Sequence, residues 1–441
     1  MTEINQRFRA LFRPARPIPV EYRRNFLHLY MEIAWYGILG GTTLAFLGVY
    51  ATRQGASAQQ IGLLSALPAM ATLFVSLPIG VWLGRSAVGP AVFWMSVFQR
   101  LCYLLFILLP VFFLPDVQVW LIILISLVMT VPGTAVTVGF TALFAEVVPV
   151  EYRGHVVGVR TGLLAIITTL FSWLSGWVLD TLPFPMGYQV VFAVGFFGAA
   201  MSCLHLYFLM PAAGRPTVRL ATAANGTRGS GNGNGYGNGL SRQLADLSQV
   251  FRRGTRSLRL DVLNGPFARL MGLLFFFHFT QFLAIPVVTP FTVNELKYSD
   301  QLIGLGGGIF NIAIFLGSMR LSTLTGRWGN KLITAAGIMS MGSFPALMAV
   351  ATTPIMYIVA NIAGGLAWSL AGGGLYNYLL DNVPPTDRPA YLAWYSMISN
   401  GAILFGSLLG PALAGQLGFT AALLLFGLAR LLAGIAILRW G

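Results

Sequence analysis

The sequence predicts an all-α membrane protein whose twelve transmembrane helices form two parallel six-helix repeats with pseudo-two-fold symmetry. Three observations lead to this fold class: long apolar runs, a polar insertion at mid-chain, and residue patterns that recur after the insertion. Hydrophobic residues make up 56% of the 441 residues and charged residues only 9%, whereas soluble proteins average about 25% charged residues. A surface with so few charges is suited to lipid, so we expect a bilayer around the protein.

The apolar runs and the turn residues between them define the expected helices. A run of about 20 residues crosses the hydrocarbon core of a bilayer, and its backbone must be hydrogen-bonded within the segment, which makes each run a helix. We expect spans at 26–52, 59–84, 91–114, 118–145, 157–179, 187–211, 267–292, 301–325, 331–350, 354–380, 389–415 and 418–438.

The polar insertion divides the chain into two halves. Residues 213–264 contain a Gly- and Asn-rich tract that is typical of a flexible linker. Its glycines neither follow a strand nor open a helix, as those of a phosphate-binding loop do. We therefore predict a basic tail over 1–25, a first half over 26–212, the linker over 213–264, and a second half over 265–441.

Residue patterns of the first half recur in the second, which indicates an internal repeat. At an offset of 242, Ile61-Gly62-Leu63 matches Ile303-Gly304-Leu305 and Gly84-Arg85 matches Gly326-Arg327. At an offset of 235, Glu146, Pro149 and Arg153 match Asp381, Pro384 and Arg388.

The net charge of +14 is distributed unevenly. Arginines crowd the first residues and the linker and return only in alternate loops, whereas the opposite loops carry Arg53 and Lys297 as their only basic residues. This alternation follows the positive-inside rule and predicts a multi-pass protein of the cytoplasmic membrane with both termini in the cytoplasm. It also argues against a nucleic-acid partner. The two cysteines lie in apolar runs and predict no disulfide.

The repeat and its motifs resemble the major facilitator superfamily over nearly the whole chain outside the tail and linker. The resemblance rests on the start of the second span (Ser57 to Leu63) and on the acid–proline–arginine pattern after the fourth span with its echo after the tenth. It implies a monomeric secondary transporter whose halves rock about a central cavity lined by the first, fourth, seventh and tenth spans. The chain departs from the family at Gly84 and Gly326, where an aspartate is usual.

The sequence contains no pattern typical of an enzyme. No metal-ligand spacing, nucleophile motif, paired carboxylates or ATP-binding element is apparent, so we expect no catalytic residues, cofactor or metal. The informative residues are polar side chains inside apolar spans, because they are costly there and tend to be functional.

Glu32 in the first span and His278 in the seventh are the candidates for proton coupling. Burial favours the neutral form of a carboxylate, which suits reversible protonation, and histidine titrates near neutral pH. Two alternatives stay open for Glu32, a permanent ion pair with Arg160 and a direct contact with substrate. For His278 the alternative is a hydrogen-bonded polar group without a transport role.

Further polar and aromatic residues fall in the spans expected to surround the cavity. As candidates for substrate contact we select Tyr36, Gln281, Thr134, Thr137, Asn361, Trp368 and Tyr376. For the threonines, close helix packing is the favoured explanation. Arg430 lies in the middle of the last span, and the sequence indicates no role for it.

Charged residues at the cytoplasmic ends of the spans predict a gate. We expect Glu146 to pair with Arg85 or Arg153, and Asp381 with Arg327 or Arg388, when the cavity faces outward. Together these features predict proton-coupled transport of a small solute. An uncoupled facilitator, a drug-efflux pump and a transporter-like scaffold protein remain alternatives, and the sequence does not identify the substrate.

Overall fold

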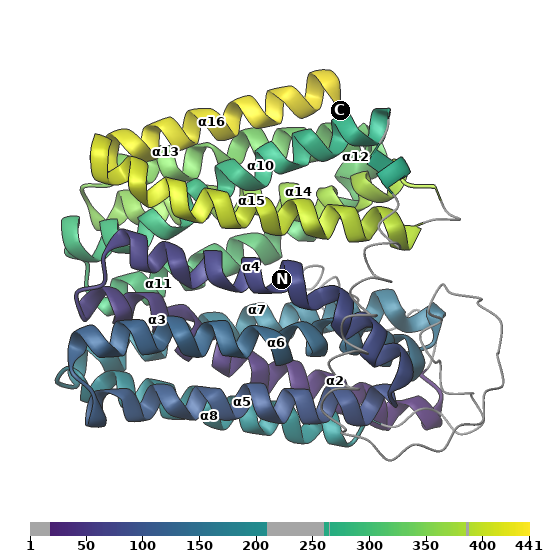
Figure 1. Ribbon diagram of the computed structural model, residues 1–441, viewed down its shortest axis with the longest axis horizontal. Helices are drawn as coiled ribbons and strands as arrows, with labels where there is room; N and C mark the ends of the chain where they lie inside the picture. Colours follow the sequence, from purple (N-terminus) through teal and green to yellow (C-terminus); the bar gives the residue numbers. More distant parts are fainter. Residues whose placement is uncertain (1–17, 210–259, 264, 385–387) are drawn as a thin grey trace, which may run out of the picture.

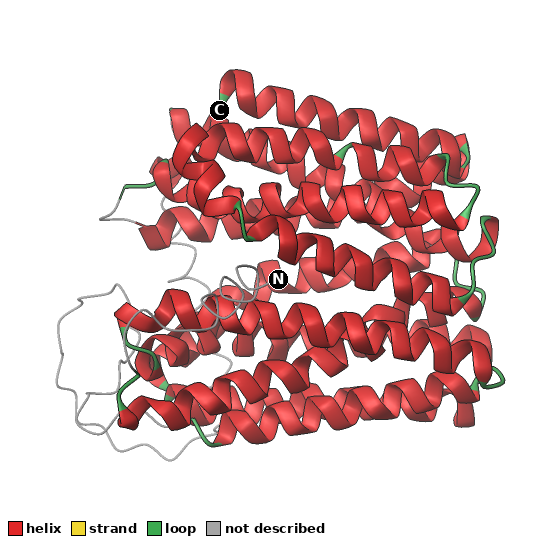
Figure 2. Ribbon diagram, turned by 180° about the vertical axis from the view of Figure 1, so that it is seen from behind, coloured by secondary structure: helices red, strands yellow, loops and turns green. Residues whose placement is uncertain are grey.

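The computed structural model describes residues 18–209, 260–263, 265–384 and 388–441, all of which lie in helices or short connections (Figure 2). Twelve segments of this part of the chain are long and apolar enough to cross a membrane, which confirms the predicted fold class. In chain order they are α2–η1–α3 (Val20–Leu39, Gly40–Leu44, Ala45–Arg53), α4 (Ala58–Arg85), α5 (Val88–Phe112), α6 (Pro115–Val147), α7 (Val150–Thr181), α8 (Met186–Tyr207), α10–η3 (Pro266–Pro290, Phe291–Glu295), α11 (Asp300–Ser318), α12–α13 (Leu321–Met341, Ser343–Ala349), α14 (Pro354–Asp381), α15 (Arg388–Leu417) and α16 (Phe419–Trp440).

Each predicted span overlaps one of these segments, although several boundaries differ. The first helix begins at Val20, inside the predicted tail. The eighth span ends earlier than predicted, at Ser318, and a separate turn of helix begins at Leu321. Gly329, with φ +80°, then breaks α12 before the ninth span continues. Most of the predicted tail and linker lies outside the described residues. The exceptions are residues 18–25 of the tail and the short helix η2 (Leu260–Leu263) of the linker.

The two halves have the same arrangement of neighbouring helices (Figure 1). In the first half α2 packs on α7 and α8, and α6 packs on α4 and α5. In the second half α10 packs on α15 and α16, and α14 packs on α11 and α12, which are the corresponding pairs. The repeat extends to the caps, because Ser57 accepts a hydrogen bond from Gln60 N and Ser299, 242 residues later, accepts one from Leu302 N.

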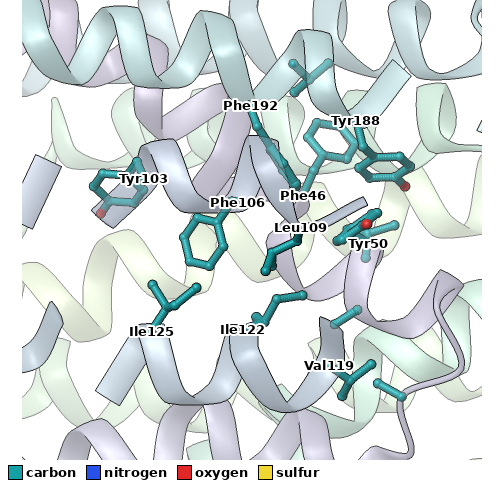
Figure 3. Packing of buried hydrophobic residues seen from close by; sticks show 14 of the residues in the cluster. Phe46, Tyr50, Tyr103, Phe106, Leu109, Val119, Ile122, Ile125, Tyr188 and Phe192 are labelled. Carbon is teal, nitrogen blue, oxygen red and sulfur yellow. The ribbon is translucent and has the colours of Figure 1, made fainter. Parts of the chain in front are cut away.

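Each half has its own apolar core. In the first half, aromatic rings from α3, α5 and α8 meet aliphatic side chains of α6 around the fully buried Phe46, Tyr50, Phe106 and Phe192 (Figure 3). Large apolar side chains such as Trp94 (63% exposed) remain on the outer surface, as expected for a surface in lipid. Val293 of η3 belongs to the cluster around Phe46, and Ile303 of α11 packs against it, so the core of the first half also contacts the second half.

Small residues bring helices into close contact within each half. A Cβ on Gly337 of α12 would clash with the backbone of Ala371 on α14. Gly337→Ala is therefore expected to lower stability by about 1–3 kcal/mol, the usual cost of overpacking. Thermal unfolding in detergent measures this change. Gly272→Ala on α10, where a Cβ would meet nothing within 4 Å, is the control and should be neutral or slightly stabilising; equal effects of the two variants would contradict the prediction.

Contacts between the halves lie at the end of the bundle opposite to the end at which α8 ends and α10 begins (Figure 1). We call the former the far end and the latter the linker end. The ribbons of the halves converge at the far end and diverge towards the linker end (Figure 1). At the far end Gly62 of α4 packs against the Ser407 backbone of α15, and Gly304 of α11 packs against Ser172 of α7. The hydroxyls of Ser172 and Thr169 donate to the carbonyls of Gly304 (2.9 Å) and Gly308 (3.0 Å).

Candidate functional site

A cavity of about 480 Å³ opens on the side of the first half that faces α15. Its wall comes mainly from α3–α6 of the first half and includes Ser396 of α15 from the second. The predicted contact residues Thr134 and Thr137 lie on this wall. Their hydroxyls donate to the carbonyls of Thr130 (2.8 Å) and Gly133 (2.9 Å), so they present only acceptor lone pairs to a ligand.

Further polar residues line the same cavity, namely Thr72, Ser76, Gln99, Tyr103, Ser126 and Thr130. Gln99 was not among the predicted contact residues, although a polar side chain inside an apolar span is the signal that pointed to Glu32. Leu44 and Leu47 also line the cavity, next to the π-helical turn Gly40–Leu44. Such turns are frequent at functional sites.

Glu32 faces the interior of the first half, where it contacts α7 and α8. Its Oε2 lies 2.8 Å from Nη1 of Arg160, and its Oε1 accepts a hydrogen bond from Ser202 (3.1 Å). Arg160 also donates to the carbonyl of Leu29 (2.7 Å) and stacks over Phe140. The ion pair that the sequence left open as an alternative is therefore formed. Arg160 lines a second cavity of about 240 Å³.

The neighbours of Glu32 on α2 have other partners. Nδ1 of His28 lies 3.0 Å from Nδ1 of His205 on α8. The ring of Tyr36 lies 5.7 Å from the guanidinium of Arg100, which is itself 5% exposed and bonded to Gln99 Oε1 (2.8 Å). The predicted candidate Tyr36 thus lies beside a buried cation that the sequence analysis did not single out.

In the second half, Gln281 and Trp368 lie together on a pocket of about 280 Å³. Nε2 of His278 is 3.0 Å from the hydroxyl of Tyr395 on α15. Asn361 is buried and donates to the carbonyl of Tyr357 on its own helix (2.8 Å), and Tyr376 is exposed nearer the linker end. The structure brings two of the predicted residues of this half to one pocket and places Asn361 and Tyr376 elsewhere on α14.

A polar network joins the halves at the far end, and of its residues only Arg53 was named from the sequence, as a loop residue. Arg53 at the end of α3 donates to Asp300 Oδ1 (2.9 and 3.2 Å) and to the carbonyl of Tyr298 (2.9 Å). Tyr188 donates to Asp300 Oδ2 (2.8 Å). The carboxylate of Asp180 accepts from the backbone N–H groups of Asp300 and Gln301, and so caps α11 from the other half. The signal in the sequence for this contact was the pair of opposite charges, Arg53 at the end of the first span and Asp300 at the start of the eighth.

The predicted gate at the linker end has local contacts. Arg153 donates to the carbonyls of Ala145 and Val148. Asp381 accepts from Asn330 (2.7 Å), Arg327 lies over the ring of Trp328, and Glu146 is buried. The exposed Arg85 and Arg388 complete the predicted set. In the described part of the chain, Asp381 forms no ion pair with Arg327 or Arg388. The halves are joined at the far end here, so the predicted pairing concerns the opposite conformation and stays a prediction.

Comparisons with known proteins agree with this architecture. The structure of the nucleoside transporter NupG has a TM-score of 0.62 at 16% identity, with coverage of 94% of this chain and 98% of that chain. The D-xylose–proton symporter has a TM-score of 0.66 at 15% identity and 95% and 97% coverage. The xylose transporter XylE from E. coli, in a partially occluded inward-open conformation, has a TM-score of 0.61 at 14% identity and 95% and 97% coverage. Such likenesses show the fold.

A curated relative adds a short stretch of sequence similarity. Multidrug resistance protein 1 of Bacillus subtilis (strain 168) is 27% identical over 139 residues, which make up 31% of this chain and 33% of that protein. The matched region therefore spans about a third of the relative's length.

The family model described as Major Facilitator Superfamily matches residues 33–267 and 270–441, nearly the whole chain. This match agrees with the twelve spans and the repeated helix packing. The chain belongs to the major facilitator superfamily, a family of transporters and not of enzymes.

Proposed function

We propose that the protein is a proton-coupled secondary transporter that moves a small solute across the cytoplasmic membrane by alternating access. The linker end and both termini face the cytoplasm in this proposal, as the distribution of arginines indicates. The far end is then extracellular, and the structure corresponds to an inward-facing state.

The observation that carries the proposal is the asymmetry of the interface between the halves. The ion pair of Arg53 with Asp300 and the bonds of Thr169 and Ser172 to α11 lie at the far end, beyond the cavity. Around these polar contacts, small residues bring α4 against α15 and α7 against α11, and Val293 and Ile303 of the second half pack on the apolar cluster of the first. An interface that is concentrated at one end can open there and close at the other end, which is the motion that alternating access requires.

Glu32 is the proposed site of proton coupling. Its carboxylate connects three helices of the first half, because Arg160 lies on α7 and Ser202 on α8. Protonation of Glu32 would remove the charge that holds Arg160, whose side chain borders an open cavity. A proton taken up here therefore changes the packing of α2 against α7, and α7 carries the contacts to the second half.

Solute-driven proton flux tests the proposal directly. The protein, reconstituted in liposomes that enclose a pH-sensitive dye, is exposed to sugars, nucleosides, organic acids, amino acids and lipophilic cations. At least one class is expected to change the internal pH, and an uncoupler should abolish accumulation of that solute. A folded protein that gives no flux with any class would favour the scaffold alternative, and solute flux without proton movement would identify a facilitator.

Export of lipophilic compounds is the second candidate, and the partial similarity to a multidrug resistance protein favours it. The direction of solute movement under a proton gradient distinguishes an exporter from a symporter. In an exporter, an inward proton gradient drives the solute out of the compartment that faces the linker end, whereas in a symporter the same gradient drives the solute into that compartment.

A further inference from the structure

Arg430 is a buried cation in the middle of α16 for which the transport mechanism above has no use. Its side chain is 2% exposed. Nη1 donates to the carbonyl of Met341 (3.2 Å), and Nη2 donates to the carbonyls of Gln281 (2.9 Å) and Thr280 (3.4 Å). In the described part of the chain no carboxylate lies within ion-pair distance of Arg430, and its Nε has no hydrogen-bond partner.

A purely structural role leaves this arrangement unexplained. The three carbonyls connect α16 to α10 and α12, but they supply dipoles and no counter-charge. A guanidinium does not lose its proton in proteins, and burying an unpaired charge is costly. A neutral side chain could connect the same helices at lower cost. An anion would supply the counter-charge that these carbonyls do not.

The pocket beside Arg430 has the shape and composition of a ligand site. Its volume of about 280 Å³ is near the lower end for pockets that hold drug-sized ligands. The rings of Phe310, Phe344 and Trp368 supply apolar wall. Gly364 is required there, because a Cβ would come within 2.6 Å of the Phe344 ring.

Gln281 provides a second polar group at the pocket. Its side-chain Oε1 is buried without a hydrogen-bond partner. The pocket thus brings together the buried cation Arg430, the side chain of Gln281 and aromatic surface. One guanidinium matches one carboxylate in charge and in donor geometry.

We propose that this pocket binds an amphiphilic monocarboxylate, with the carboxylate paired to Arg430 and the apolar body against Trp368, Phe310 and Phe344. The proposal rests on the proposed transport function and names the substrate class.

Paired ligands that differ only in charge test the proposal without any mutation. Binding to the purified full-length protein in detergent is measured by titration calorimetry for indole-3-acetate, benzoate and decanoate, each against its neutral amide. A charge-assisted hydrogen bond predicts that at least one acid binds about 10- to 100-fold more tightly than its amide. Preference for decanoate would identify a lipid-derived acid, and preference for indole-3-acetate or benzoate a soluble aromatic acid. Equal affinity of acid and amide in all three pairs overturns the proposal.

Substitutions test whether Arg430 is the source of the preference for the acid over its amide. Arg430→Gln should abolish the preference for the acid, whereas Arg439→Gln, the same change at an exposed position of the same helix, should retain it. Trp368→Leu keeps the charge and should weaken acid and amide alike without changing their ratio. If Arg430→Gln does not fold, the acid-to-amide ratio in wild type and in Trp368→Leu still decides. A preference that survives in folded Arg430→Gln overturns the proposal.

Failure of this proposal is distinguishable from failure of the proposed function. Binding in detergent requires neither a gradient nor transport. Acid binding without proton flux in liposomes would contradict the transport function and leave the site intact. Proton flux driven by an uncharged solute, together with equal affinity for acids and amides, would leave the transport function intact and contradict this substrate class.

Discussion

Glu32→Gln is expected to abolish accumulation of the solute against its gradient while exchange across the membrane continues. Glutamine keeps the size and hydrogen-bonding capacity of the side chain, so contacts with Ser202 and Arg160 persist without the charge. It takes up no proton, so the driving force of the proton gradient is lost, whereas the halves still rock. Uptake and counterflow assays in the same proteoliposomes separate these two activities.

The alternative, a permanent ion pair between Glu32 and Arg160, predicts a different outcome. Removal of one partner from a buried pair typically costs about 3–5 kcal/mol. In that case Glu32→Gln would lower thermal stability and reduce exchange as much as accumulation. Glu151→Gln, the same change at an exposed position at the start of α7, controls for loss of a negative charge. Undiminished uphill transport by Glu32→Gln would exclude proton coupling at this residue.

Asp300→Asn is expected to shift the protein towards the state that is open at the far end. The substitution removes the ion pair with Arg53 and weakens the acceptor for Tyr188, while Asp180 still caps α11. Asp300 is 8% exposed, but Arg53 is 29% exposed, so solvent screening limits the cost to about 1–3 kcal/mol. This corresponds to a roughly 5- to 150-fold change in the ratio of the two states.

Cysteine labelling measures this shift. Ser396 lies on the wall of the central cavity, and both native cysteines are buried, so a Ser396→Cys background has one accessible thiol in the described part of the chain. A membrane-impermeant thiol reagent added at the far end should label it faster when Asp300→Asn is also present. Glu295→Gln removes an exposed acid near the same end and should leave the rate unchanged. An unchanged rate in Asp300→Asn would show that the ion pair does not hold the far end closed.

The fold class could be predicted because lipid constrains the sequence strongly. Each apolar run must form a helix to satisfy its backbone, and the recurrence of Ile61-Gly62-Leu63 at Ile303 revealed the repeat directly. Helix ends were less predictable where glycine and short polar stretches allow either a turn or continuation, as at Ser318 and Gly329.

The sequence identified candidate residues but not the groups that they contact in the folded protein. The cost of burying polar groups marks Glu32, Gln281 and Arg430 in any reading of the sequence. Which groups they meet depends on the rotation of each helix about its axis, and apolar surroundings on all sides leave little periodicity to indicate it. For this reason the sequence left the partner of Glu32 open between alternatives, and Arg430 without a role.

The sequence by itself determined the membrane environment, the twelve helices and the repeat, because these follow from local composition and from spacing along the chain. Only the tertiary structure decided that Arg53 meets Asp300 and that Arg430 shares a pocket with Gln281 and Trp368. Arg53 and Asp300 are 247 residues apart, and Arg430 and Gln281 are 149 apart. Contacts at such separations depend on how whole helices pack, and no local pattern in the chain encodes that packing.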